Sequence, residues 1–178
     1  MRLFIAIQLP KEIRNYLSKL QKQFSNTGKI TFTKEQHLTI KFLGEITRTQ
    51  EKIIQKKLST VIFQPFSLTL SGIGFFPDER NARILWVGLQ LNNHINELQK
   101  KIDEILTPQF KKDKNFVPHI TLGRIKTITN KAQFNKLAQQ TQIQPLQISV
   151  NEFQLIESKL AEKEPKYAIL QSFFAQSL

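Results

Sequence analysis

The sequence reads His37-Leu38-Thr39-Ile40 in its first half and His119-Ile120-Thr121-Leu122 in its second. Both stretches follow one pattern: histidine, apolar residue, threonine, apolar residue. In an extended strand successive side chains point to opposite faces, so each histidine shares a face with its threonine and the apolar pair occupies the other face. The chain has only three histidines, so chance is a poor explanation of the repeat. We interpret both stretches as half-buried strands that each present one imidazole beside one hydroxyl.

The composition is that of an ordinary globular protein, with 178 residues, 40% of them hydrophobic and 22% charged. The net charge of +12 favours a polyanionic partner, and nucleic acid is the obvious candidate. A lysine-rich surface that serves only solubility is the alternative. The absence of cysteine excludes thiolate metal sites and cysteine nucleophiles, and it fits a reducing compartment.

No apolar run approaches the roughly 18 residues that a membrane span needs. The apolar run at the start of the chain is too short for a convincing signal peptide, and charged residues follow it at once. We therefore expect a cytoplasmic protein with no membrane segment. No feature of the sequence points to an obligate protein partner, and a monomer is expected.

Hydrophobic periodicity predicts alternating strands and helices along the chain. Strands are expected at 3–9, 30–33, the first histidine stretch, 66–71, 83–89, the second histidine stretch, 146–158 and 167–175, with a charged loop at 161–166 before the last. Helices are expected at 10–24, 47–63, 95–105 and 130–141. The two histidines lie about half the chain apart, each on a strand followed by a helix, which is typical of a duplication. The sequence thus predicts one bilobed α+β domain over residues 1–178, with two similar lobes facing each other across a groove.

A groove lined by both histidine strands brings two imidazoles and two hydroxyls together. Imidazole titrates near neutral pH, so one histidine can accept a proton while the other donates one, as phosphodiester cleavage or formation requires. Thr39 and Thr121 are placed to stabilise charge on the non-bridging phosphate oxygens. By strand parity Lys41 shares the face of His37 and adds positive charge, whereas the side of Arg124 depends on whether Gly123 breaks the alternation.

The alternative role for the two motif histidines is to bind a metal ion. A zinc site needs about three or four ligands, and neither motif supplies a cysteine or a carboxylate to complete one, so no metal is expected. The third histidine, His94, lies at a predicted helix start with no threonine two residues on, and we interpret it as a surface or capping residue. No Gly-x-Ser-x-Gly turn is present to support a serine hydrolase.

At these residues the sequence resembles the 2H phosphoesterase superfamily, and within it the RNA 2′,3′-cyclic phosphodiesterases that are also called 2′-5′ RNA ligases. The resemblance runs almost end to end and is carried by residues 2–7, 37–44, 116–124 and by Tyr167, Leu170 and Phe173. The commonest family form of the second motif has alanine before the arginine, where this chain has Gly123.

The resemblance implies a bilobed α+β fold with pseudo-twofold symmetry, helices outside two antiparallel sheets, and no cofactor. It implies hydrolysis of RNA-terminal 2′,3′-cyclic phosphate to a 2′-phosphate, with His37 as general acid and His119 as general base. It also places Phe42 and Arg124 beside the terminal nucleobase or phosphate. A ligase or a phosphodiesterase for another small cyclic or 2′-5′ nucleotide remains an alternative, as does a non-catalytic RNA-binding protein.

Overall fold

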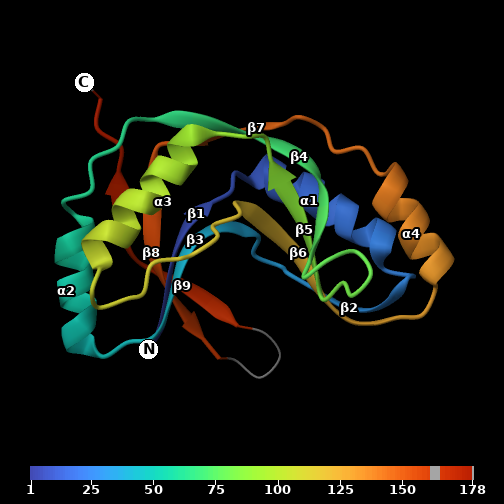
Figure 1. Cartoon of the computed structure of the whole chain (residues 1–178), viewed down its shortest axis with the longest axis horizontal. Coiled ribbons are helices and arrows are strands. Elements are labelled where there is room, and N and C mark those ends of the chain that lie inside the picture. The colour runs from blue at the N-terminus through green and yellow to red at the C-terminus, as the bar shows by residue number, and fades with distance from the viewer. Residues whose placement is uncertain (161–164, 178) are drawn as a thin grey trace.

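The computed structural model describes residues 1–160 and 165–177, and these residues form one antiparallel sheet with helices packed against it (Figure 1). Residues 161–164 of the predicted charged loop lie outside the described residues. The strands are β1 (Arg2–Gln8), β2 (Gly28–Phe32), β3 (His37–Glu45), β4 (Phe66–Phe76), β5 (Ile84–Leu89), β6 (His119–Ile128), β7 (Gln147–Val150), β8 (Glu152–Lys159) and β9 (Lys166–Phe174). The helices are α1 (Lys11–Phe24), α2 (Arg48–Leu58), α3 (Asn93–Leu106) and α4 (Lys131–Gln140).

The strand order β7-β4-β5-β6-β3-β1-β8-β9 divides into two lobes at the contact between β6 and β3. Lobe 1 contains β3, β1, β8 and β9, whereas lobe 2 contains β6, β5, β4 and β7 with β2 paired to β6. Each histidine strand is therefore the innermost strand of its lobe. Among the described residues, β3 and β6 are joined by a single pair of Cα partners, Leu38 and Ile120. The predicted α+β, two-lobed architecture is confirmed, with the refinement that the two antiparallel sheets are continuous at this point.

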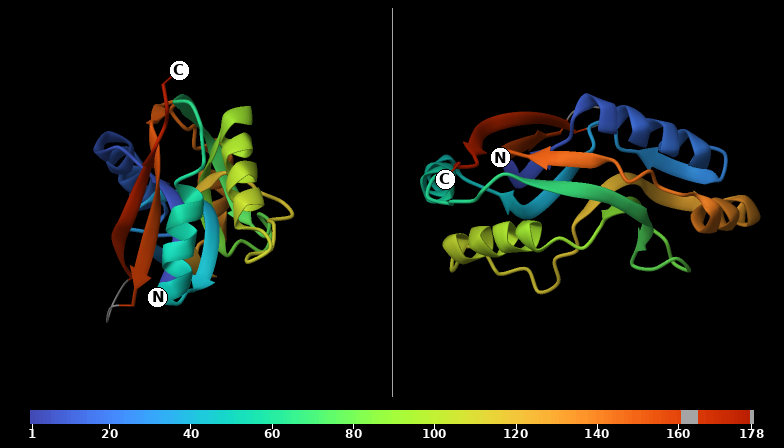
Figure 2. Two further views of the ribbon diagram at one scale, coloured as in Figure 1. Left: turned by 90° about the vertical axis from the view of Figure 1, so that its left-hand side faces the viewer. Right: turned by 90° about the horizontal axis from the view of Figure 1, so that it is seen from above.

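Each helix has an apolar face, and α2, α3 and α4 also begin at a residue whose side chain caps the helix. The Thr47 hydroxyl accepts from the Gln50 backbone and the Gln50 side chain accepts from the Thr47 backbone, which is a capping box at the start of α2. Asn92 and Asn130 cap α3 and α4 through their side-chain oxygens. The chain crosses between lobes as it folds, because α2 and α3 pack on lobe 1 and α1 and α4 on lobe 2 (Figures 1 and 2).

Two strands differ from the sequence-based expectation. The single strand predicted at 146–158 is two strands that meet at Asn151, because β7 pairs with β4 of lobe 2 and β8 pairs with β1 of lobe 1. The strand expected to end before Gly72 continues to Phe76, since the first part of β4 pairs with β7 and the rest with β5. The extension of β4 depends on pairing with two strands that are far apart in the sequence.

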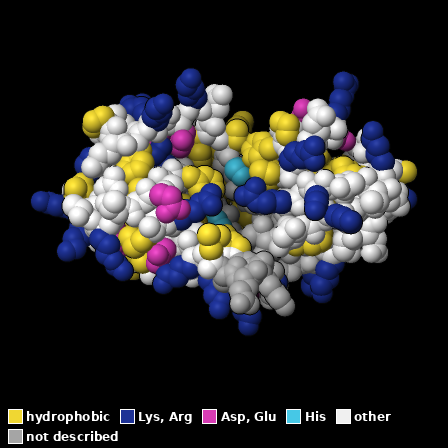
Figure 3. All heavy atoms as spheres, turned by 90° about the horizontal axis from the view of Figure 1, so that it is seen from below, with side chains coloured by type: hydrophobic (Ala, Val, Ile, Leu, Met, Phe, Trp, Pro, Cys, Tyr) yellow, Lys and Arg dark blue, Asp and Glu magenta, His cyan; other side chains and the backbone are white. Residues whose placement is uncertain are grey.

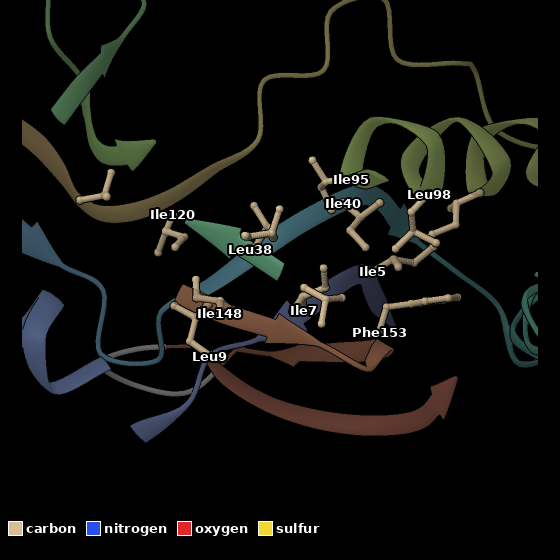
Figure 4. Packing of buried hydrophobic residues seen from close by; sticks show 14 of the residues in the cluster. Ile5, Ile7, Leu9, Leu38, Ile40, Ile95, Leu98, Ile120, Ile148 and Phe153 are labelled. Carbon is tan, nitrogen blue, oxygen red and sulfur yellow. The ribbon is translucent and has the colours of Figure 1, made fainter. Parts of the chain in front are cut away.

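The hydrophobic core lies between the sheet and the helices and runs through both lobes. The apolar residues of the histidine motifs belong to it: Leu38, Ile40 and Ile120 are buried among residues of β1, β8 and α3 (Figure 4). This burial fixes the register of β3 and β6, because a shift by one residue would turn the histidines into the core. The histidines and threonines consequently face away from the core.

Candidate active site

The site forms where β3 and β6 meet. Leu38 and Ile120 are partners in an antiparallel pair, so the residues that flank them also face each other: His37 lies across from Thr121, and Thr39 from His119. Opposite side chains in such a pair have Cβ atoms about 4.5 to 5.5 Å apart, and diagonal neighbours about 7 to 8 Å. The two histidines are diagonal neighbours on one face. The structure thus brings together the four residues that the two motifs singled out.

Both imidazoles are oriented in the same way by the backbone. His37 Nδ1 lies 2.9 Å from the carbonyl oxygen of Glu35, and His119 Nδ1 lies 2.7 Å from that of Val117. A carbonyl oxygen can only accept, so Nδ1 carries the proton in both rings. Nε2 is therefore the nitrogen through which each histidine can exchange a proton with a ligand.

Aromatic rings pack around each imidazole and limit its movement. In lobe 1 the His37 ring lies 4.9 Å from the Phe4 ring and 5.2 Å from the Tyr167 ring, measured between centroids. In lobe 2 the His119 ring lies 4.8 Å from Phe76 and 5.9 Å from Trp86. The sequence did not identify these rings as part of the site. Their place in it depends on pairing with β1, β4, β5 and β9, which no local pattern reveals.

A β-bulge follows each motif and changes which side chains share the face of the histidine. Thr39 pairs with Ala6 and Lys41 with Ile5, so β3 has one extra residue at this point. In β6 the same irregularity occurs: Trp86 of β5 pairs with Thr121 and Leu85 with Gly123, so β6 also has one extra residue. After each bulge the alternation is reversed.

This reversal decides which face of its strand carries each of three predicted site residues. Phe42 is 68% exposed, and its ring lies 6.1 Å from that of Phe4 beside His37. Arg124 is likewise exposed, because the bulge before Gly123 breaks the alternation of β6. The expectation that Lys41 shares the face of His37 is wrong, because the bulge turns this side chain inward, where it is 3% exposed and paired with Asp103. Lys41 therefore does not line the face that the histidines share.

Both histidines lie in surroundings that disfavour the charged ring. Burial lowers the pKa of His37 below its ordinary value of 6.5; the hydrogen bond to Glu35 opposes this shift, and repulsion from His119 adds to it. Burial lowers the pKa of His119 as well, against the hydrogen bond to Val117. The repulsion from His119 is the smallest of the causes that act on the pKa of His37, and burial is the largest. A bound anion would favour protonation of the pair.

The face that carries the site is hollowed between the lobes. Histidine atoms are visible in the middle of this hollow, with hydrophobic and basic side chains around it (Figure 3). A recess of about 40 Å³ opens directly beside His37 and is lined by residues that include Arg14, Gln36 and Tyr167. A larger hollow of about 390 Å³ lies between α1 and α4, lined mainly by glutamines, and contains none of the motif residues.

Other features of the described residues add little to the site. His94 is exposed in the first turn of α3, with its ring stacked 5.7 Å from Phe66, as expected for a surface residue near a cap. Within residues 1–160 and 165–177, no group of three His, Asp or Glu residues is arranged to hold a metal ion. No helix in the same residues has both the length and the apolar character to span a membrane.

Comparison with known protein families finds one match in each half of the chain. The family model described as LigT like Phosphoesterase matches the chain twice, over residues 7–86 and over residues 88–167. Each match contains one of the two histidine motifs. The double match agrees with the duplication that the spacing of the motifs predicts.

Curated relatives and solved structures extend the similarity over nearly the whole chain. An RNA 2′,3′-cyclic phosphodiesterase of Methanocaldococcus jannaschii is 34% identical, covering 97% of this chain and 100% of that protein. A protein of the same name from Thermotoga maritima is 30% identical, over 96% of this chain and 93% of that protein. The crystal structure of E. coli LigT in its apo form matches with a TM-score of 0.79 and 26% identity, covering 99% of this chain and 98% of that one.

Proposed function

The chain belongs to the LigT-like phosphoesterase family, and from this we propose that it is a hydrolase that opens RNA-terminal 2′,3′-cyclic phosphate to a 2′-phosphate. The observation that carries the proposal is the junction of β3 and β6, where two imidazoles and two hydroxyls share one face on either side of the Leu38–Ile120 pair. Relatives named RNA 2′,3′-cyclic phosphodiesterase support the choice of substrate.

The proposed reaction needs one proton acceptor and one proton donor on opposite sides of a phosphorus atom. His119, as general base, takes a proton through Nε2 from a water molecule whose oxygen attacks phosphorus. The bond from phosphorus to the ribose O3′ breaks, and His37, as general acid, gives its proton to that oxygen. The terminal phosphate is left on O2′, and the two histidines exchange protonation states before the next turnover.

The hydroxyls stabilise the negative charge that builds on the non-bridging phosphate oxygens. Thr39 and Thr121 lie beside the opposite strand's histidine as well as beside their own, so each can donate to an oxygen of a phosphate held between the rings. Donors that are already in place stabilise a transition state without reorganisation, and removing one costs about 10² to 10³ in kcat in enzymes that use such groups. The packing of the strands on the core holds these donors in position.

Phe42 and Arg124 suit the rest of an RNA end. The exposed Phe42 ring offers a surface on which a terminal base can stack, and the Arg124 guanidinium can pair with a phosphate. A net charge of +12 attracts the polyanionic chain. One relative, E. coli LigT, has been crystallised with 3′-AMP. We expect the protein to act as a cytoplasmic monomer without a cofactor, which stays a prediction.

The test is hydrolysis of a short RNA that ends in a 2′,3′-cyclic phosphate, followed by ³¹P NMR in the presence of excess EDTA. The proposal expects the cyclic phosphate signal to be replaced by that of a 2′-monophosphate. A 3′-monophosphate product would contradict the assignment of the leaving oxygen. RNA binding without any turnover would contradict the proposal and favour the non-catalytic alternative, and 2′-5′ joined products as the main outcome would favour a ligase.

A further inference from the structure

The bulge that removes Lys41 from the shared face places its ammonium group in a buried ionic cluster. Lys41 Nζ lies 2.5 Å from Asp103 Oδ1, 3.4 Å from Asp113 Oδ2 and 2.9 Å from the carbonyl oxygen of Lys111. The ammonium group thus donates a hydrogen bond to the Lys111 carbonyl oxygen and forms ion pairs with both carboxylates. The aspartate of α3 is itself only 4% exposed.

The acceptors belong to parts of the chain that lead to the other lobe. Asp103 Oδ2 accepts from the Asp113 backbone nitrogen at 2.8 Å and from Gln99 Nε2 at 3.0 Å. Asp113 and Lys111 lie in the segment 107–118, which leaves α3 on lobe 1 and crosses to β6 of lobe 2 (Figure 1). That segment includes Val117, whose carbonyl oxygen accepts a hydrogen bond from His119 Nδ1. The strand that carries His37 thus anchors the segment that orients His119.

A second anchor runs in the opposite direction. Gln21 of α1, which is buried on lobe 2, donates from Nε2 to the carbonyl oxygens of Thr33 at 2.7 Å and of Leu122 at 2.8 Å. Thr33 also donates from its backbone nitrogen to Leu122 O at 2.9 Å. Thr33 begins the segment 33–36 that leads to His37, and Glu35 in that segment holds His37 Nδ1. The strand that carries His119 thus anchors the segment that orients His37.

We propose that Lys41 and Gln21 are positioning residues that act crosswise: Lys41, from the strand of His37, fixes the orientation of His119, and Gln21, against the strand of His119, fixes that of His37. The arrangement makes the geometry of each imidazole depend on the opposite lobe, so the two rings stay aligned on one phosphate only while both lobes are docked. The kinetic test of this proposal, given below, rests on the proposed function. The NMR test rests on the hydrogen bonds alone.

The first inward-facing position after each bulge is Lys41 in β3 and Gly123 in β6, and this difference explains why one lobe is anchored by a lysine and the other by Gln21. In β6 this position is Gly123, where a Cβ would lie 2.9 Å from Ile30 Cγ2 and 3.0 Å from the Thr31 carbonyl oxygen. Strand β2 fills the space that would hold a side chain. Among the described residues, β3 has no strand partner at Lys41 on the side away from β1, and the lysine reaches across to Asp103 of α3 instead. One anchor is therefore ionic and the other neutral.

The experiment compares Asp113→Asn and Gln21→Met in the full-length protein, with Glu104→Gln as the control. Asp113 has a half-exposed side chain, and both carbonyl oxygens that Gln21 contacts keep another donor, since Thr33 O accepts from Gln36 Nε2 and Leu122 O from the Thr33 backbone. Both variants are therefore expected to fold. Glu104→Gln changes the charge of α3 by the same amount as Asp113→Asn changes that of the loop, at an exposed side chain.

The first readout is the pKa of each imidazole, followed by ¹⁵N NMR of the ring nitrogens. The hydrogen bond to Val117 raises the pKa of His119 and that to Glu35 raises the pKa of His37, against the larger effect of burial. Loss of that hydrogen bond, with the ring still packed between its aromatic neighbours, therefore lowers the pKa of the histidine. Asp113→Asn should lower the pKa of His119 more than that of His37, and Gln21→Met should do the reverse. Equal shifts in both variants, or no shift in either, would overturn the crosswise assignment.

The second readout is turnover of a cyclic phosphate substrate. A misplacement of about 1 Å can cost up to about 10² in rate, so each variant should lose about tenfold in kcat with less than a threefold change in KM, and Glu104→Gln should match the unmodified protein. Lys41→Arg should retain more activity than Lys41→Met. Equal activity of these two variants would overturn the role of the ionic anchor. If the unmodified protein turns over no cyclic phosphate, the proposed function fails while the NMR arm still decides the positioning role.

Discussion

Thr39 lies across the lobe junction from His119, on the same face of the sheet, and Thr121 lies across from His37 in the same way. Each imidazole therefore has a hydroxyl neighbour from its own strand and another from the opposite strand. This crossed arrangement follows from the antiparallel pairing of two copies of one motif. It means that neither lobe alone contains a complete proton acceptor, proton donor and pair of hydroxyl donors.

We expect Thr39→Val and Thr121→Val each to lower kcat by about 10²-fold, because valine keeps the shape of threonine but cannot donate to a phosphate oxygen. Steady-state kinetics on a 2′,3′-cyclic phosphate substrate measures the effect. Thr127→Val is the matched control, since Thr127 is an exposed threonine further along β6. A loss of less than threefold in both motif variants would contradict the role of the hydroxyls.

Replacing either histidine should remove most of the activity. His37→Ala and His119→Ala are each expected to lose about 10² to 10⁴ in rate, the usual contribution of general acid or base catalysis. The double variant should lose little more than the worse single variant, because groups that act as a unit are not additive. His94→Ala is the control. Full activity of the His37→Ala protein would refute the catalytic assignment.

The pH dependence follows from the direction of the two pKa shifts. Burial lowers the pKa of both histidines below 6.5, so raising the pH above 6.5 removes the proton that the general acid must carry. We expect kcat/KM, which reports the free enzyme, to fall between pH 6.5 and 8.5, and kcat to peak at higher pH because bound phosphate favours protonation. The pH profiles of both constants check this. A kcat/KM that rises between pH 7 and 8.5 would be inconsistent with the lowered pKa values.

The single tryptophan of the chain provides a reporter for one histidine. The Trp86 ring lies 5.9 Å from His119, close enough for a charged imidazole to alter its emission. Fluorescence should therefore titrate with a midpoint below 6.5, since burial lowers the pKa of His119. His119→Gln should abolish the titration and His37→Gln should leave it in place. A titration that survives in His119→Gln would assign the change to another group.

A glycine beside this tryptophan offers a test of how the aromatic rings of lobe 2 hold His119. Gly74 pairs with Trp86, and a Cβ at residue 74 would overlap the indole ring. We expect Gly74→Ala to displace Trp86, to shift its emission and to lower kcat, because the ring that packs beside His119 must move. Gly72→Ala, where the added Cβ meets no atom within 4 Å, is the control. Unchanged emission in Gly74→Ala would show that the ring does not depend on this contact.

The sequence predicts the site up to Thr39 and Thr121, and it fails directly afterwards. Alternation places His37 with Thr39 correctly because Leu38 and Ile40 are buried together. It places Lys41 wrongly because the bulge depends on how β1 pairs with β3, and no local pattern records that pairing. Asn151 is a different case: apolar residues at even positions before it and at odd positions after it already indicated a break in the predicted strand 146–158. Trp86 and Tyr167 could not be assigned to the site, because strands distant in the sequence bring them there.

The most direct test is a titration of the protein with inorganic phosphate, observed through the Nε2 resonances of His37 and His119 by ¹⁵N NMR. If both imidazoles act on one phosphorus atom, both signals should shift along the same binding curve, with one Kd and a stoichiometry of one phosphate per chain. A response from only one ring, or two curves with different affinities, would show that the histidines do not share a phosphate.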